Sequence, residues 1–210
     1  MGTYLITEVK APDGYLINET KYLSIIEQDD SAPGGVKTTY FDQTNGKQLD
    51  QILDPHTGDR AVATLEQVVR GDYKFTKVNE ARDTLSGIPF KITSKTTGEW
   101  HIVVTDQNGL IDTSNSHYKH SQNTNCNDSL YDAETGKIAK EESLTSNCGT
   151  WFGINKETGT LSVPDDTYSA LPYDTYLIEE IPISLNEKYL PFETRTFVIE
   201  NDTYNIAGDT

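Results

Sequence analysis

Tyr176-Leu177-Ile178-Glu179-Glu180 is the stretch that decides how this chain folds. Tyr176, Ile178 and Glu180 alternate with the residues between them, and this alternation predicts a β-strand that turns one face toward a core. A near copy stands at residues 4–8, and the segment 194–199 that follows the later copy has a counterpart at 20–25. The repetition predicts two related β modules, one at each end of the chain.

The composition favours an all-β chain and argues against two classes of partner. Twelve tyrosines, together with many threonines and valines, favour strands over helices. The net charge of -16 argues against nucleic acid or an anionic membrane surface, because phosphate binding requires a basic face. No apolar run reaches membrane-spanning length, so we expect no membrane insertion within this segment.

The chain opens inside a repeat rather than with a leader, since residues 2–4 parallel residues 174–176. We therefore expect it to be part of a longer protein whose secretion and anchoring signals lie outside this segment. Residues 1–68 are interpreted as the C-terminal part of a preceding β module plus a connector, with turn residues at 29–35. A second module is expected over residues 69–210.

Residues 69–210 contain several short strand patterns separated by turns, which is typical of a β-sandwich. A hairpin is indicated by Asn108-Gly109. A polar stretch at about 113–165 is far longer than an ordinary connection between strands, so we expect a long loop insertion there. The predicted strands cover residues 73–78, 86–93, 100–104, 173–181 and 194–201.

Three polar residues fall on strand faces that the alternation predicts to be buried. Lys77 shares its face with two aromatic residues, Glu180 with the apolar residues of its strand, and Asn201 with Phe197 and Ile199. Burying an unpaired charge is costly, and desolvation favours the neutral forms of amines and carboxylic acids. A buried pair of this kind can hold a neutral amine beside a neutral carboxylic acid.

Such a pair can form a covalent bond inside the fold. A neutral amine is a nucleophile. The protonated Glu180 carboxyl group could polarise the Asn201 carbonyl and then shuttle the proton that departing ammonia needs. The expected product is an isopeptide bond between Lys77 and Asn201 that forms once per molecule. We therefore expect self-modification and not an enzyme, and we expect no cofactor.

These residues stand in a pattern that resembles the Cna B-type domain, the transthyretin-like module of Gram-positive pilins and surface adhesins. In that family a first-strand lysine bonds to a last-strand Asn or Asp with help from a glutamate, and Lys77, Asn201 and Glu180 match those positions. Other segments are similar to modules of VaFE-repeat surface-anchored proteins. The segments that carry these resemblances are 73–78, 85–90, 176–180 and 197–201, the E-x-x-A-P-x-G-Y ending at 8–15, and 123–128, 149–153 and 170–176.

The resemblance implies a transthyretin-like or immunoglobulin-like β-sandwich with a structural role. The expected protein is a stalk or adhesin module of a Gram-positive cell-wall surface protein, extracellular and anchored to the cell wall. Its expected partners are neighbouring modules of the same chain. The alternative function is a ligand-binding adhesin module that recognises a host protein or glycan through the insertion at 113–165.

Two alternatives to this crosslink stay open. Lys77 can be a surface lysine that pairs with Glu180 in a plain salt bridge. Asp202 can be the acceptor if the register slips by one residue, although that slip turns its side chain to the other face. The N-terminal copy has no lysine before Glu8 and has Glu27 in the place of the asparagine, so we expect no complete bond there.

Cys126 and Cys148 are the only cysteines, and both lie in the insertion. An even number of cysteines in a surface protein predicts a disulfide, with two free thiols as the alternative. Metal binding would need more ligands than this pair and the nearby His117 and His120 supply, so we expect no metal site. Arg70-Gly71-Asp72 spells an integrin-binding tripeptide, but so short a motif arises by chance, and we expect it only to lead into the first strand.

Overall fold

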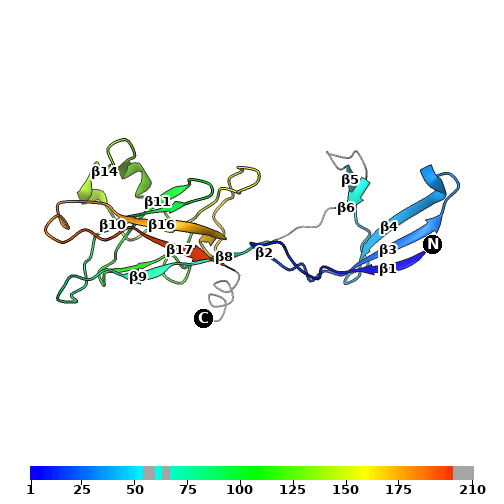
Figure 1. The fold of residues 1–210 in the computed structure, drawn as a ribbon, viewed down its shortest axis with the longest axis horizontal. Coiled ribbons are helices and arrows are strands. Elements are labelled where there is room, and N and C mark those ends of the chain that lie inside the picture. The colour runs from blue at the N-terminus through cyan, green and yellow to red at the C-terminus, as the bar shows by residue number, and fades with distance from the viewer. Residues whose placement is uncertain (54–59, 63–66, 201–210) are drawn as a thin grey trace. The chain divides into compact units, whose positions relative to one another are not determined.

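The computed structural model describes residues 1–53, 60–62 and 67–200 and shows a chain built from short β-strands (Figure 1). The strand pairs are antiparallel, and the only helical segments in those residues are three-residue 3-10 turns. This confirms the all-β prediction. Contacts divide the chain into two compact units, Met1–Val68 and Val69–Thr210. Within the same described ranges, no helix is long and apolar enough to cross a bilayer.

The unit of residues 1–68 is organised around a three-stranded antiparallel sheet with the order β1-β3-β4. The turn between β3 and β4 includes Gly34 and Gly35 at φ values of 80° and 73°, which only glycine adopts without strain. This backbone conformation explains why glycines stand in the turn predicted at 29–35. The strands are β1 (Gly2–Ile6), β3 (Tyr22–Gln28) and β4 (Val36–Asp42), and two short pairs join β2 (Tyr15–Leu16) to β7 (Gln67–Val68) and β5 (Gln51–Leu53) to β6 (Arg60–Val62).

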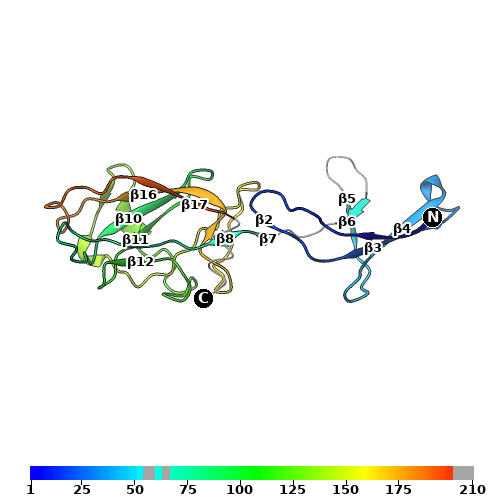
Figure 2. The ribbon, with the colours of Figure 1, turned by 60° about the horizontal axis from the view of Figure 1, so that its bottom comes forward.

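The unit of residues 69–210 contains a four-stranded antiparallel sheet with the order β11-β10-β16-β17, whose strands lie beside one another in Figure 2. The register pairs Phe90 with Glu180 and Ile92 with Ile178. Because successive side chains of a strand point to opposite faces, this register gathers the apolar residues of the two central strands on one face. The strands are β10 (Pro89–Ser94), β11 (Trp100–Val104), β16 (Asp174–Glu180) and β17 (Arg195–Ile199).

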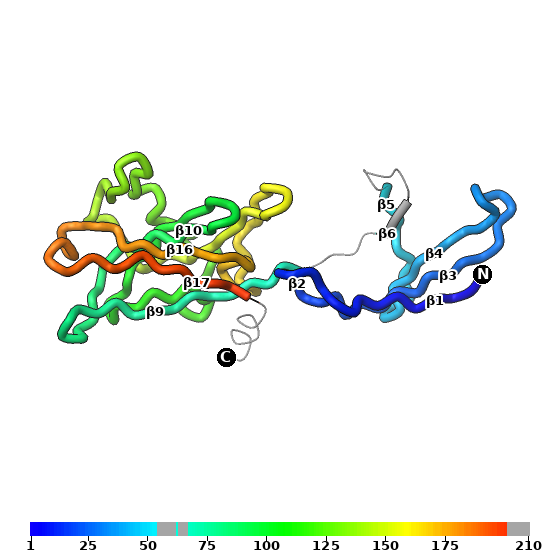
Figure 3. The backbone as a smooth tube through the Cα atoms, in the orientation of Figure 1, coloured from blue at the N-terminus to red at the C-terminus, as the bar shows by residue number. Residues whose placement is uncertain are grey.

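A second layer covers one face of this sheet. It contains the pair β9 (Lys74–Thr76) with β12 (Leu110–Asp112) and the pair β8 (Arg70–Gly71) with β15 (Leu171–Pro172). The rings of Phe75 and Phe90 lie 5.0 Å apart, and Tyr73 stacks on Phe197 at 3.7 Å. These contacts join the start of the unit to its end. The backbones of β9 and β17 are labelled in Figure 3. Two packed antiparallel layers are consistent with a β-sandwich.

The insertion at 113–165 is folded and is more than a loop. Its strand β14 contributes Ile138 to a second apolar cluster with Ile102, Ile181 and Ile183. The sequence did not indicate that this segment is ordered, because the segment is polar. Hydrogen bonds from side chains to the backbone order it, and an apolar stripe does not. Its elements are η2 (Asp128–Leu130), β13 (Tyr131–Asp132), β14 (Lys137–Ile138) and η3 (Glu141–Ser143).

Candidate functional site around Lys77 and Glu180

Lys77 and Glu180 meet between the two layers of the sandwich. Lys77 directly follows β9, and Glu180 is the last residue of β16. The Lys77 Nζ atom lies 2.7 Å from Glu180 Oε2, and the two side chains are only 11% and 7% exposed. Each charge offsets part of the cost of burying the other. The structure therefore brings together two of the three residues that the sequence assigns to the crosslink.

Two further groups hold the Glu180 carboxylate in place. Asn186 Nδ2 donates a hydrogen bond to Oε1 at 2.7 Å, and the backbone N–H of Phe192 donates to Oε2 at 3.2 Å. Asn186 is itself fixed, because its Oδ1 accepts a hydrogen bond from the N–H of Ile183 at 2.7 Å. No sequence pattern singles out Asn186, since asparagine is ordinary in a segment that looks like a turn.

Asn201, the third predicted residue, lies outside the described residues. The strand that leads toward it, β17, ends at Ile199, and Ile199 pairs with Asp174 at the far end of β16 from Glu180. Glu180 lies six positions after Asp174 along β16, which is about 20 Å in a strand. Bonding of Lys77 to Asn201 stays a prediction, and it would require β17 to leave this register. Asp202 also lies outside the described residues.

The corresponding strands of the two repeat copies, β3 and β17, differ in the number of neighbouring strands with which they pair. In the unit of residues 1–68, β3 pairs with β1 on one side and with β4 on the other. In the unit of residues 69–210, β17 pairs with β16, and the part of that unit that the structure describes places no strand on the other side of β17. Among the described residues, the outer edge of β17 therefore has no strand partner.

An open groove of about 520 Å³ runs beside Lys77. It is lined by residues 77–81, by Leu85 and by residues 188–190. Lys77 belongs to this lining although most of its side chain is covered. Of the two members of the Lys77–Glu180 pair, Lys77 is therefore the one that borders this groove.

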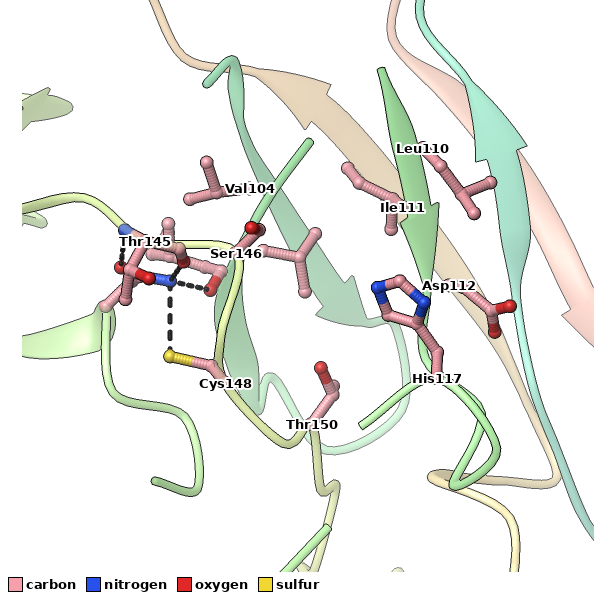
Figure 4. Close-up of a pocket in the computed structure, with 12 residues that line it drawn as sticks. Val104, Leu110, Ile111, Asp112, His117, Thr145, Ser146, Cys148 and Thr150 are labelled. Carbon is pink, nitrogen blue, oxygen red and sulfur yellow. Dashed lines mark hydrogen bonds between the residues drawn. The ribbon is translucent and has the colours of Figure 1, made fainter. Parts of the chain in front are cut away.

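Cys126 and Cys148 form a disulfide within the insertion, so the two thiols are not free. Asn127, the neighbour of Cys126, is buried, and its amide group donates to the Thr145 carbonyl oxygen at 2.8 Å and accepts from the Thr145 N–H at 3.1 Å (Figure 4). The cavity in this picture measures about 20 Å³, which is room for roughly one water molecule. It is too small to be a ligand site.

The Arg70-Gly71-Asp72 tripeptide is used inside the module. The Arg70 guanidinium group stacks on Trp151 at 3.8 Å, and burial lowers the pKa of Arg70 to about 10. Asp72 Oδ1 accepts a hydrogen bond from the N–H of Ala170 at 2.9 Å. Arg70 also donates to the carbonyl oxygens of Phe152, Ser169 and Ala170 at 2.6–2.7 Å. Neither charged group is presented for recognition by a partner.

The histidines of the insertion do not converge with other ligands. His120 is fully buried, and burial lowers the pKa of its imidazole. In the described part of the chain, no group of three or more His, Cys, Asp or Glu side chains is arranged so that it could hold a metal ion. Comparison of the chain with protein-family models, with curated proteins and with solved structures gave no match.

Proposed function

We propose that this chain is part of a Gram-positive cell-wall surface protein, in which it serves as a stalk or adhesin module of the Cna B type with a transthyretin-like sandwich. Its role is mechanical, namely to hold a binding tip or a fibre away from the cell. The observation that carries the proposal is the buried 2.7 Å contact between Lys77 and Glu180, which joins the first strand of the module to a late one. The sequence pattern around both residues supports it.

The proposal includes an intramolecular isopeptide bond at Lys77. The lysine nitrogen bonds to a side-chain carboxamide carbon, the bond from that carbon to its amide nitrogen breaks, and Glu180 passes the proton that leaves with ammonia. Glu180 is suited to this because Oε2 contacts Nζ while Asn186 fixes Oε1. Asn201 is the predicted acceptor. The reaction occurs once per molecule and needs no cofactor.

The intact mass of the purified chain, measured after reduction of the disulfide, tests this bond. Loss of ammonia lowers the mass by about 17 Da, as the condensation of an amine with a carboxamide requires. Lys77→Ala and Glu180→Ala should each abolish the loss, and Lys95→Ala, at an exposed lysine, should retain it. Asn201→Ala with peptide mapping identifies the acceptor. An unshifted wild-type mass would leave Lys77 and Glu180 as a salt bridge only.

Ligand binding by the insertion is a second candidate, favoured by how firmly this segment is anchored. The disulfide closes part of the segment on itself, and the stacking of Arg70 on Trp151 fixes the segment to the module. Loops on a rigid scaffold often carry recognition. Leu161 and Val163 are 75% and 81% exposed on it. Binding screens should compare the wild type with the variant Leu161→Ser/Val163→Ser. Unchanged binding of every ligand found would remove this face from consideration.

A further inference from the structure

The imidazole of His101 lies between two carboxylates, at a place separate from Lys77. His101 Nδ1 is 2.8 Å from Asp128 Oδ2, and His101 Nε2 is 3.1 Å from Glu99 Oε1. An ionised carboxylate can only accept hydrogen bonds. Both contacts are therefore hydrogen bonds only when both ring nitrogens carry a proton. The geometry favours the positively charged imidazolium form of His101.

This arrangement connects the sheet to both sides of the inserted segment. His101 belongs to β11, whereas Asp128 starts η2 in the insertion. The second oxygen of Asp128, Oδ1, accepts a hydrogen bond from the N–H of Ile102 at 2.9 Å. The Glu99 carboxylate accepts from the N–H groups of Gly153 and Ile154 at 2.8 and 2.9 Å. The two carboxylates thus hold the insertion at two points, one inside the loop that the disulfide closes and one after Cys148.

The neutral imidazole of His101 has a second hydrogen-bond partner within reach. Asn125 Nδ2 lies 3.3 Å from His101 Nε2 and donates to the Trp151 carbonyl oxygen at 2.9 Å. When Nε2 loses its proton to solvent, it can no longer donate to Glu99, but it can accept a hydrogen bond from Asn125. Glu99 then faces a lone pair in place of a donor. The two protonation states of His101 therefore have different partners.

The other groups around the imidazole do not change charge near neutral pH. The strand neighbour of His101 on β10 is Ile92, and the Phe152 ring packs against the imidazole at 4.5 Å. Arg70 and Tyr176 are the further titratable groups whose charges act on Glu99. Burial lowers the pKa of Arg70 to about 10 and raises the pKa of Tyr176 above its usual value of 10.0. His101 is therefore the group of this set that titrates near neutrality.

We propose that Glu99, His101 and Asp128 form a pH-responsive latch that holds the insertion against the sheet while His101 is protonated. Burial alone would lower the pKa of His101, but the hydrogen bonds with Asp128 and Glu99 outweigh it and raise the pKa above 6.5. Burial would likewise raise the pKa of Glu99, but the hydrogen bonds from His101, Gly153 and Ile154 outweigh it and lower the pKa below 4.5.

The direction of the switch follows from these shifts. A histidine whose pKa is raised on folding stabilises the fold fully below its unfolded value of 6.5, and this contribution is lost as the pH rises through the folded pKa. A glutamate with a lowered pKa stabilises above 4.5, and its contribution is lost as the pH falls through the folded value. The latch is therefore closed in mildly acidic solution and opens as the pH rises through the folded pKa of His101, which lies above 6.5.

The protonation state of His101 is tested first, by imidazole ¹⁵N resonances of the whole chain recorded between about pH 5 and 9, the range that brackets the ordinary histidine pKa. We expect both ring nitrogens of His101 to be protonated on the acidic side of the titration midpoint and the midpoint itself to lie above 6.5. Glu99→Gln and Asp128→Asn should each move the midpoint down. A wild-type midpoint at or below 6.5 would overturn the latch.

Opening of the latch is tested by hydrogen exchange of the Gly153 and Ile154 amides, corrected for intrinsic rates. Their protection should fall as His101 deprotonates, about tenfold for each unit by which the midpoint exceeds 6.5. The Thr105 amide, which donates to the Ile88 carbonyl oxygen in the sheet, is the internal control and should keep its protection.

Two variants separate the latch from general unfolding. His101→Gln should remove the pH dependence of the two amides, and Asn125→Ala, which leaves both carboxylates in place, should steepen it by removing the alternative partner of the neutral ring. If His101→Gln fails to fold, the second variant still decides the question. The same pH dependence in wild type and in a folded His101→Gln or Asn125→Ala variant would overturn the proposal, as would wild-type protection that does not change with pH.

Discussion

Lys77 and Glu180 show how much a residue's local pattern can predict. Each was placed on a buried face because apolar residues stand two positions away, and each has a mostly covered side chain. Asn186 could not be found in this way. It reaches Glu180 only because a turn from Ile183 to Asn186 folds the chain back, and nothing in the alternation of a strand encodes that turn.

The contribution of the Lys77–Glu180 pair to stability should depend on its charges more than on the packing of its side chains. Lys77→Met should lower the free energy of unfolding by about 3–5 kcal/mol, because it leaves the buried Glu180 carboxylate without a counter-ion. Lys77→Met/Glu180→Gln should recover much of this loss, since no charge remains and glutamine still accepts a hydrogen bond from Asn186. Urea unfolding measures both variants. Lys95→Met, at an exposed position, is the control and should change stability by less than about 0.5 kcal/mol.

A double variant as unstable as Lys77→Met alone would contradict this account. In that case packing of the lysine stem would be the main contribution, for example against the Phe192 ring, which lies 5.4 Å from Nζ. Intact mass should be recorded for each sample, because a crosslinked wild type would lose a covalent bond as well as an ion pair.

At the scale of elements, strands could be predicted but their register could not. Strands were expected at 86–93 and 173–181, and β10 and β16 run over Pro89–Ser94 and Asp174–Glu180. Alternation fixes which residues share a face, whereas the partner of each residue depends on the whole sheet. That is why the sequence placed Asn201 with Glu180, while the strand leading to it ends opposite Asp174.

Asp174 illustrates the same limit on a smaller scale. An aspartate at the start of a strand looks like a surface residue, yet Asp174 is buried. Its carboxylate accepts hydrogen bonds from the hydroxyl groups of Ser94 at 2.5 Å and Thr96 at 2.7 Å. Ser94 is the last residue of β10, and Thr96 lies in the turn that follows it. No periodicity within 173–181 could have indicated them.

Gly149, the residue after Cys148, marks a close backbone approach within the insertion. A Cβ atom there would overlap the Lys119 carbonyl oxygen and lie 2.8 Å from His120 Cα. Both contacts are with backbone, which cannot swing aside as a side chain can. Gly149→Ala should therefore destabilise the chain by about 3 kcal/mol, at the upper end of what overpacking costs. Thermal unfolding under oxidising conditions measures this.

Gly2→Ala provides the control for this substitution. The nearest atoms to a Cβ at Gly2 belong to the Tyr4 ring at 3.6 Å, which is ordinary van der Waals contact. This variant should leave the melting temperature unchanged. Equal melting temperatures of Gly149→Ala and the wild type would show that residues 119–120 and 149 do not pack as the structure has them.

At the scale of the whole molecule, the repeat predicted a relationship between the two ends but not their different burial. Tyr176 and Ile178 of β16 are fully covered. In β1, the corresponding copy, Tyr4 and Ile6 are 52% and 46% exposed. The same alternation gives opposite results because burial depends on the elements that cover a strand, and those lie outside the repeated sequence.

This difference predicts where cooperative stability resides. Every buried hydrophobic side chain among the described residues lies at or after Val69. A short unit without a buried apolar core cannot offset the conformational entropy that folding removes. We therefore expect residues 69–210, prepared as a separate fragment, to unfold in one transition at the melting temperature of the whole chain. Residues 1–68 alone should show no cooperative transition.

Differential scanning calorimetry of the two fragments and the whole chain measures this, with the disulfide kept oxidised because Cys126 and Cys148 both lie in the later fragment. The whole chain is the reference, and its single transition should carry nearly the enthalpy of fragment 69–210. A fragment that melts more than about 5 °C below the whole chain would contradict the prediction, since a shift of that size corresponds to about 1 kcal/mol or more in a domain of this length. Residues 1–68 would then stabilise the later unit through contacts that its own core does not supply.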